Sequence, residues 1–234
     1  MTTTRPREGA ARSADPLARG SASHRALLIA GGLSSLLYFA ADVLGGMRYP
    51  GYDFSSQAVS ELMAIGAPTE RFVDRLFVVY CLLALAFGLG VFREGGGRSR
   101  PLRIAGALLI ANAVIGFTLP TLFEMHQRGA GGPGSDTPHI IVTGTLVMLQ
   151  LGAIGLAALA LGKRFRLYSF ATLLIGMVLG VASVPYSLRV DAGQPTPGFG
   201  ILERILIYGF MLWVTVLAIA LFRAATRESS AADS

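Results

Sequence analysis

Residues 76–92, LFVVYCLLALAFGLGVF, form an apolar run without a single charged side chain. A helix needs roughly 20 such residues to cross the hydrocarbon layer of a membrane. Four more runs carry no charge, at 104–123, 140–162, 167–188 and 205–222, and the run 26–47 is interrupted only by Asp42. Because unpaired backbone groups find no partner in lipid, the spans must be helices. The pattern predicts an all-α polytopic membrane protein with six transmembrane helices arranged as three hairpins.

The composition agrees with this class and argues against a separate soluble domain. Only 15% of the 234 residues are charged, against about 25% in soluble domains, and 53% are hydrophobic. We expect one membrane domain, residues 25–224, with no separate soluble domain. Its spans are expected at about 26–47, 71–92, 104–123, 139–162, 167–188 and 203–223. The tails 1–24 and 225–234 are polar and are expected to be disordered.

The first apolar run has an alternative interpretation as a secretory signal peptide. A basic N-terminal region precedes it, and Phe39-Ala40-Ala41 resembles a cleavage site. The run is long for a signal peptide, however, and continues past Asp42 to Met47. Its length favours a retained first span.

The distribution of basic residues predicts the orientation. With the N-terminus inside, 14 Lys and Arg lie on the cytoplasmic side and six lie outside. The outer six are Arg48, Arg71, Arg75, Arg128, Arg189 and Arg204. The positive-inside rule then places both termini in the cytoplasm of a multi-pass protein of the plasma (inner) membrane. The net charge of +6 is therefore a topology signal, and we expect the lipid bilayer, not nucleic acid, as the partner.

The acidic residues show the opposite bias and point to the outer face as the place of any chemistry. The three outer loops, 47–70, 124–138 and 188–203, contain seven of the 14 acidic residues, whereas the inner loops 93–103 and 163–166 contain one. Asp42 lies close enough to the outer end of its span to be solvated at the interface. Asn112 and Gln150 fall near mid-membrane, where hydrogen bonds between helices are expected. The single cysteine, Cys81, excludes an intramolecular disulfide.

The first outer loop contains an organised polar segment, YPGYDFSSQAVSELMAIGAP at 49–68. Its apolar residues recur with helical spacing over 55–65. Gly66 supplies a left-handed stop and Pro68 prevents continuation. The pattern predicts a short amphipathic helix at the outer interface. Its polar face either meets water or covers a cavity; the sequence leaves both alternatives open.

Several short motifs are similar to those of a known family. They are Gly51-Tyr52, Ser60-Glu61-Leu62, Gly66-Ala67-Pro68, His139 at the start of the fourth span, and Glu203-Arg204 at the start of the sixth with Trp213 further along it. Over about residues 26–224 the chain resembles the bacterial and archaeal six-span membrane proteins catalogued as domain of unknown function 998. The family has no assigned activity, so the resemblance implies a fold and a polar face but no reaction.

The sequence analysis proposes one polar site at the outer end, for a lipid headgroup or a small solute. Its expected members are Ser60, Glu61, His139, Glu203 and Arg204. Arg204 is expected to pair with Glu61, because Glu203 points about 100° away from it on the helix. Accessory candidates are Asp42, Tyr52, Asp53, Glu124 and His126.

Two other functions remain open at this point, and with them whether the protein is an enzyme. Glu124, His126 and His139 offer oxygen and nitrogen ligands that zinc accepts. No His-Glu-X-X-His spacing is present, so no cofactor is predicted and a divalent metal is the alternative. A hydrolase built on Ser60 and His139, with or without a metal, is one competing hypothesis. A structural or regulatory membrane subunit is the other.

Overall fold

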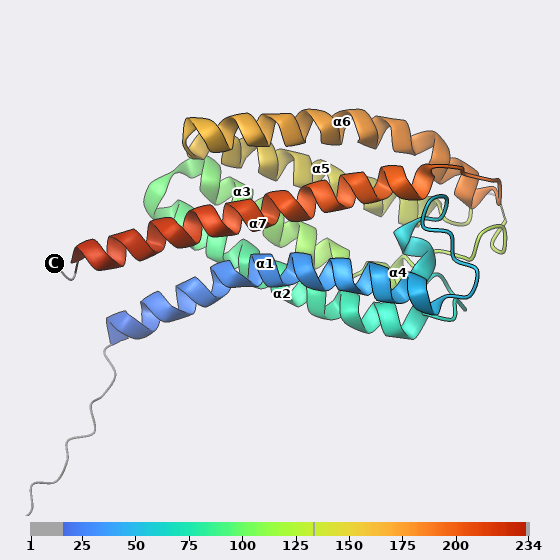
Figure 1. Cartoon of the computed structure of the whole chain (residues 1–234), viewed down its shortest axis with the longest axis horizontal. Helices are drawn as coiled ribbons and strands as arrows, with labels where there is room; N and C mark the ends of the chain where they lie inside the picture. The colour runs from blue at the N-terminus through green and yellow to red at the C-terminus, as the bar shows by residue number, and fades with distance from the viewer. Residues whose placement is uncertain (1–15, 133, 233–234) are drawn as a thin grey trace, which may run out of the picture.

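The computed structural model describes residues 16–132 and 134–232, and its regular structure is helical throughout that part of the chain (Figure 1). The helices are α1 (Pro16–Arg48), the 3₁₀ helix η1 (Val59–Met63), α2 (Glu70–Arg98), α3 (Arg100–Gly116), α4 (Leu119–Leu122), α5 (Thr137–Ala160), α6 (Lys163–Asp191) and α7 (Phe199–Ala232). Six stretches within them are long and apolar enough to cross a membrane. The all-α fold with six candidate spans is confirmed.

The six long helices form a closed ring that follows the order of the chain. Each long helix packs against the next along the chain, and α7 returns to pack against α1. Figure 1 shows all three long loops at one end of the bundle, beside α4. The tight α2–α3 and α5–α6 turns and the C-terminus lie at the other end. The ring therefore has a loop-bearing end and an end with short connections.

Helical structure continues beyond the expected spans at both ends of the chain. The expectation of disorder in 1–24 is wrong from Pro16 onward, where α1 begins, because proline suits the first turn of a helix. The same expectation for 225–234 is wrong up to Ala232, the end of α7. Alanine, arginine and glutamate in that segment favour a helix. Residues 1–15 and 233–234 lie outside the described part.

Packing around the ring is uneven. Glycines bring α2 and α3 into backbone contact: a Cβ atom on Gly106 would lie 2.4 Å from the amide nitrogen of Phe92. Small residues at a helix crossing allow this close approach. On the opposite side, only 6% of the most apolar stretch of α6 is buried, against 39% for those of α1, α3 and α7. The loosely packed side of the ring is where a cavity remains.

Candidate functional site

The polar segment 49–68 folds as a series of turns and one short 3₁₀ helix. The expected amphipathic helix over 55–65 is wrong in extent, because only Val59–Met63 is helical. Side chains from outside residues 55–65 bind carbonyl groups that an α-helix would use internally. The Tyr52 hydroxyl donates to the carbonyl oxygen of Ala58 at 2.7 Å, and Arg204 donates to that of Gln57 at 3.2 Å. Gly66 is left-handed as expected, with φ of +77°, but the helix already ends at Met63, before this glycine.

The turn before this helix is stabilised by Asp53. Its carboxylate accepts hydrogen bonds from the backbone amide and the hydroxyl of Ser55, at 2.8 and 2.7 Å. These hydrogen bonds favour the charged form and lower the pKa of Asp53 below its ordinary value. Asp53 thus shapes the loop and is not part of the cavity described below.

Arg204, near the start of α7, forms a two-pronged ion pair with Asp42 of α1. Its Nε donates to Oδ2 of Asp42 at 2.9 Å, and its Nη2 to Oδ1 at 2.7 Å. The remaining donors bind the carbonyl oxygen of Phe54 at 2.8 Å and the hydroxyl of Tyr52 at 2.9 Å. Asp42 is 1% exposed and also accepts from the hydroxyl of Tyr208. The ion pair joins α1 to α7, and the other hydrogen bonds of Arg204 attach the first outer loop to them.

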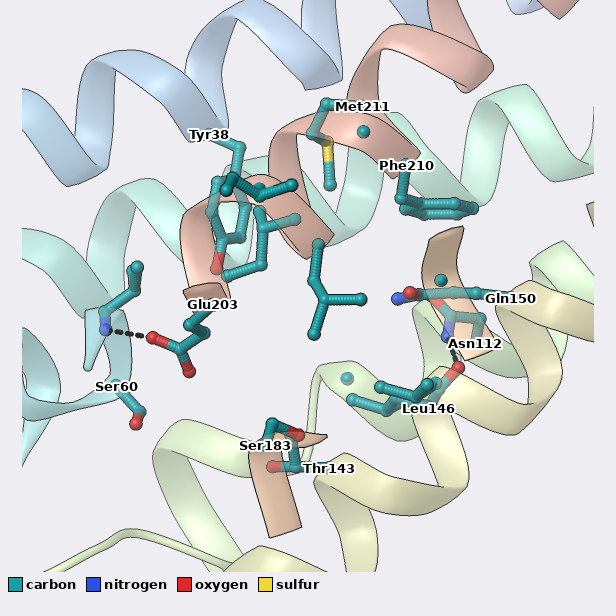
Figure 2. A pocket seen from close by; sticks show the side chains of 18 of the residues that line it. Tyr38, Ser60, Asn112, Thr143, Leu146, Gln150, Ser183, Glu203, Phe210 and Met211 are labelled. Carbon is teal, nitrogen blue, oxygen red and sulfur yellow. Dashed lines mark hydrogen bonds between the residues drawn. The ribbon is translucent and has the colours of Figure 1, made fainter. Parts of the chain in front are cut away.

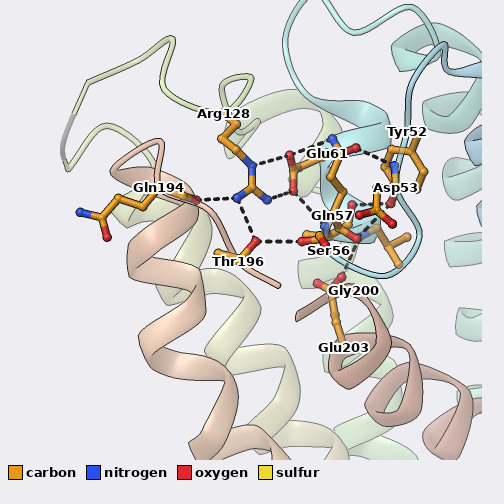
Figure 3. Close-up of polar contacts among 12 residues, drawn as sticks. Tyr52, Asp53, Ser56, Gln57, Glu61, Arg128, Gln194, Thr196, Gly200 and Glu203 are labelled. Atoms are coloured by element: carbon orange, nitrogen blue, oxygen red, sulfur yellow. Dashed lines mark hydrogen bonds and ion pairs between the residues drawn. The ribbon is translucent and has the colours of Figure 1, made fainter. Parts of the chain in front are cut away.

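Glu61 has a different partner, in a second network that joins the three long loops (Figure 3). Arg128 donates through Nη2 to Oε1 of Glu61 at 2.7 Å and through Nε to Oε2 at 3.2 Å. Its Nη1 binds the carbonyl oxygen of Gln194 at 2.7 Å and the hydroxyl of Thr196 at 2.8 Å. Thr196 in turn donates to the carbonyl oxygen of Ser56 at 2.8 Å.

The two networks correct two expectations about charge pairing. The expected Glu61–Arg204 pair is wrong, because Asp42 takes Arg204 and Arg128 takes Glu61. Solvation of Asp42 at the interface is also wrong, since its carboxylate is buried against α7. Both errors have one cause: the ring closes α1 against α7, so Asp42 reaches Arg204 from the other end of the chain.

The candidate metal ligands make separate contacts. His126 binds Oδ1 of Asp136 through Nδ1 at 2.8 Å, and the backbone amide of Asp136 donates to Asp191 at 2.9 Å. Glu124 is exposed, while His139 is buried at the start of α5. Over residues 16–132 and 134–232 no group of three or more His, Cys, Asp or Glu side chains could hold a metal ion.

Beneath η1, the loosely packed side of the ring contains a partly open cavity of about 400 Å³ (Figure 2). All six long helices and η1 contribute to its wall. Most of the wall is apolar, with Leu146, Ile154, Phe210 and Met211 among its residues. Ser60, His139 and Glu203 line it at the loop-bearing end, and Asn112, Thr143, Gln150 and Ser183 line it further in.

Glu203 is the carboxylate of this cavity. Its Oε2 accepts a hydrogen bond of 2.6 Å from the backbone amide of Val59 in η1. Figure 2 shows the side chain pointing into the space bordered by Ser60, Thr143 and Ser183. Within the described residues no hydrogen bond reaches its other oxygen, Oε1. Glu203 therefore holds the 3₁₀ helix in place with one oxygen and presents the other to the cavity.

Two other polar groups of the wall keep unused hydrogen-bonding capacity. The Nδ1 atom of His139 lies 2.7 Å from the carbonyl oxygen of Phe123, so it carries the proton there and leaves Nε2 as an acceptor. The hydroxyl of Thr143 is buried without a hydrogen-bond partner in the described structure. By contrast, Asn112 donates to the carbonyl oxygen of Leu146 at 2.9 Å, the expected bond between helices.

The structure thus divides the expected site into two layers. Ser60, His139 and Glu203 line the cavity, while Glu61 and Arg204 hold the loops above it. No hydrogen bond joins Ser60 to His139 in the described part of the chain. Sequence reasoning missed Arg128 as the partner of Glu61. The signal that could have found it is that Arg128 is the one Lys or Arg of the loop 124–138, while the neighbouring outer loops also contain acids.

The structure defines a polytopic helical membrane protein whose six-helix ring contains a ligand-sized cavity. Residues 32–220 match the model of one protein family, described as "Protein of unknown function (DUF998)", and the chain belongs to this family. Neither the curated proteins nor the solved structures include a match to the chain.

Proposed function

We propose that this protein binds a membrane amphiphile inside its helix ring, with the polar head beside Glu203 and the apolar chain along α5 and α7. The loop-bearing end then faces the outside of the plasma membrane, as the 14 basic residues on the opposite side favour. The ligand lies under η1, so the first outer loop covers its head. In this proposal the polar segment 49–68 forms the roof of a binding cavity.

The shape and lining of the cavity carry the proposal. Its volume of about 400 Å³ lies within the 300–1,000 Å³ typical of ligand pockets. Its wall follows α5 from His139 to Ile154, which spans about 22 Å at 1.5 Å per residue. The hydroxyls of Thr172 and Ser183 on α6 bind carbonyl oxygens of their own helix. A long, mostly apolar space with one carboxylate at its end suits an apolar chain with a polar head.

Filling the cavity should abolish binding. A Cβ atom on Gly209, which lines the cavity, would meet no atom within 4 Å. Leucine at this position would project into the open space. We expect 1-dodecanol to stabilise the unmodified protein, by about 2.7 kcal/mol at a hundredfold excess over Kd, and to leave Gly209→Leu unchanged. Unfolding of the purified protein, followed with and without 1-dodecanol, measures this.

Gly144→Leu is the matched control. Gly144 also lies in a long helix, a Cβ atom there meets nothing within 4 Å, and the residue is exposed and outside the cavity wall. Both substitutions change helix propensity equally. Gly144→Leu should therefore respond to 1-dodecanol as the unmodified protein does. Equal responses of all three proteins, or none in any of them, would contradict the proposal.

A further inference from the structure

Among the described residues, Glu203 is the acid that lines the cavity, and no cation pairs with it. Asp42 has Arg204, and Glu61 has Arg128. Asp136 has His126. Glu203 is the only acidic residue in the cavity wall over the described residues, and neither Lys nor Arg lines it there.

An uncompensated carboxylate is costly in an apolar, poorly solvated space. Burying a charge without a partner costs several kcal/mol in proteins. The backbone amide of Val59 supplies one neutral donor to Oε2. Arg204 follows Glu203 in sequence, but its guanidinium is bound by Asp42, Tyr52 and backbone carbonyl groups. Among the described residues, His139 is the one basic side chain in the wall, and its Nδ1–H donates a hydrogen bond to the carbonyl oxygen of Phe123.

We infer that the head of the bound amphiphile is a cationic amine, whose ammonium group donates a hydrogen bond to Oε1 of Glu203. This inference rests on the proposed binding function and names the chemical class of its ligand. Ser60 lines the same end of the cavity and offers a hydroxyl acceptor to the amine. A phosphate beside the amine is disfavoured, because no basic side chain of the described wall is free to neutralise it. The ligand class is therefore a phosphate-free amphiphile with an amine head.

Three probes with the same apolar chain test the charge of the head. Dodecylamine, 1-dodecanol and dodecanoate are titrated into the unmodified protein in nanodiscs, and binding is followed by the fluorescence of Trp213. This is the only tryptophan of the chain, and it stacks on Phe210 of the cavity wall with ring centroids 6.0 Å apart. A charge-assisted hydrogen bond is about twice as strong as a neutral one. We expect the amine to bind about tenfold more tightly than the alcohol, and dodecanoate most weakly.

Glu203→Gln removes the charge and keeps an oxygen that can accept from Val59. In this variant the amine should lose its advantage and bind no more tightly than 1-dodecanol. In Gly209→Leu the leucine fills the cavity. The fluorescence change measured in this variant is therefore that of probe dissolved in the lipid alone. The probe comparison on the unmodified protein decides the question even if Glu203→Gln fails to fold.

The outcomes separate this inference from the proposed function. Equal binding of amine and alcohol to the unmodified protein, above the Gly209→Leu signal, would overturn the amine head and leave the binding function standing. Tighter binding of dodecanoate would overturn it as well. If no probe exceeds the Gly209→Leu signal, both proposals fail. An amine preference that persists unchanged in Glu203→Gln would overturn the role of Glu203.

Discussion

Replacing Arg204 by glutamine is expected to lower the free energy of unfolding by about 3–5 kcal/mol, the cost of removing one partner of a buried ion pair. The substitution leaves the carboxylate of Asp42, 1% exposed, without its cation. It also removes the donors that hold the carbonyl oxygens of Phe54 and Gln57. Equilibrium unfolding of the purified protein in mixed detergent micelles measures the loss.

An exposed arginine and a double-mutant cycle provide the controls. Arg48 lies at the exposed end of α1 with its guanidinium 4.3 Å from the ring centroid of Phe72, and Arg48→Gln should cost about 0.5–1 kcal/mol. Combining Arg204→Gln with Asp42→Asn should cost less than the sum of the two single changes, because neither charge is then left alone. Additive losses would show that the two side chains are not paired in the folded protein.

Arg128→Gln should cause the next largest loss in the free energy of unfolding. It should do so by loosening the three outer loops that Arg128 joins. Arg128 is the only described residue that bridges Glu61 and Thr196. Its loss should cost about 1.5–3 kcal/mol, the value of hydrogen bonds to a charged group. This is less than for Arg204, because 22% of the Arg128 side chain is exposed and water can replace it in part. Unfolding under the same conditions measures the loss.

Hydrogen exchange distinguishes a loop effect from a general one. In Arg128→Gln the backbone amides of Ala58 and Val59, which donate to Glu61 and Glu203, should exchange faster, while amides within α2 and α3 keep their protection. Arg71→Gln, at an exposed position in α2, should change neither. Uniformly faster exchange in the helices would mean that Arg128 supports the whole bundle and not the roof of the cavity.

The sequence predicted the number of spans because lipid imposes a simple rule on them. Every spanning segment must be an apolar helix, so the uncharged runs identify six helices without further knowledge. The order of helices around the ring follows no such rule. The contact between α1 and α7 brings Asp42 to Arg204, 162 residues apart in sequence. Hydropathy carries no information about that contact, and the partner of Arg204 was therefore mistaken.

The first outer loop shows a second limit of sequence reasoning. Its apolar spacing is helical, but Tyr52 and Arg204 compete for the carbonyl groups of Gln57 and Ala58. Hydrogen bonds from the side chains of Tyr52 in the same loop and Arg204 in α7 therefore override the local pattern and leave only Val59–Met63 helical. Val59, Ser60 and Met63 of this helix line the cavity, and that the segment covers a bound ligand remains our proposal. Ser60, His139 and Glu203 line the same cavity because all three lie at the loop-bearing end. Ser60 is in η1, His139 is near the start of α5, and Glu203 is near the start of α7.

Photolabelling tests most directly whether an amphiphile occupies the ring. A dodecanol carrying a photoreactive diazirine is added to the protein in nanodiscs, irradiated, and its attachment sites are mapped by mass spectrometry. Binding in the cavity predicts labels on Leu151 and Met211, which line it, in addition to the lipid-facing Leu167 and Val181, each 75% exposed. The two cavity labels should disappear in Gly209→Leu while the lipid-facing labels remain. Labels confined to Leu167 and Val181, or cavity labels that persist in Gly209→Leu, would contradict the account.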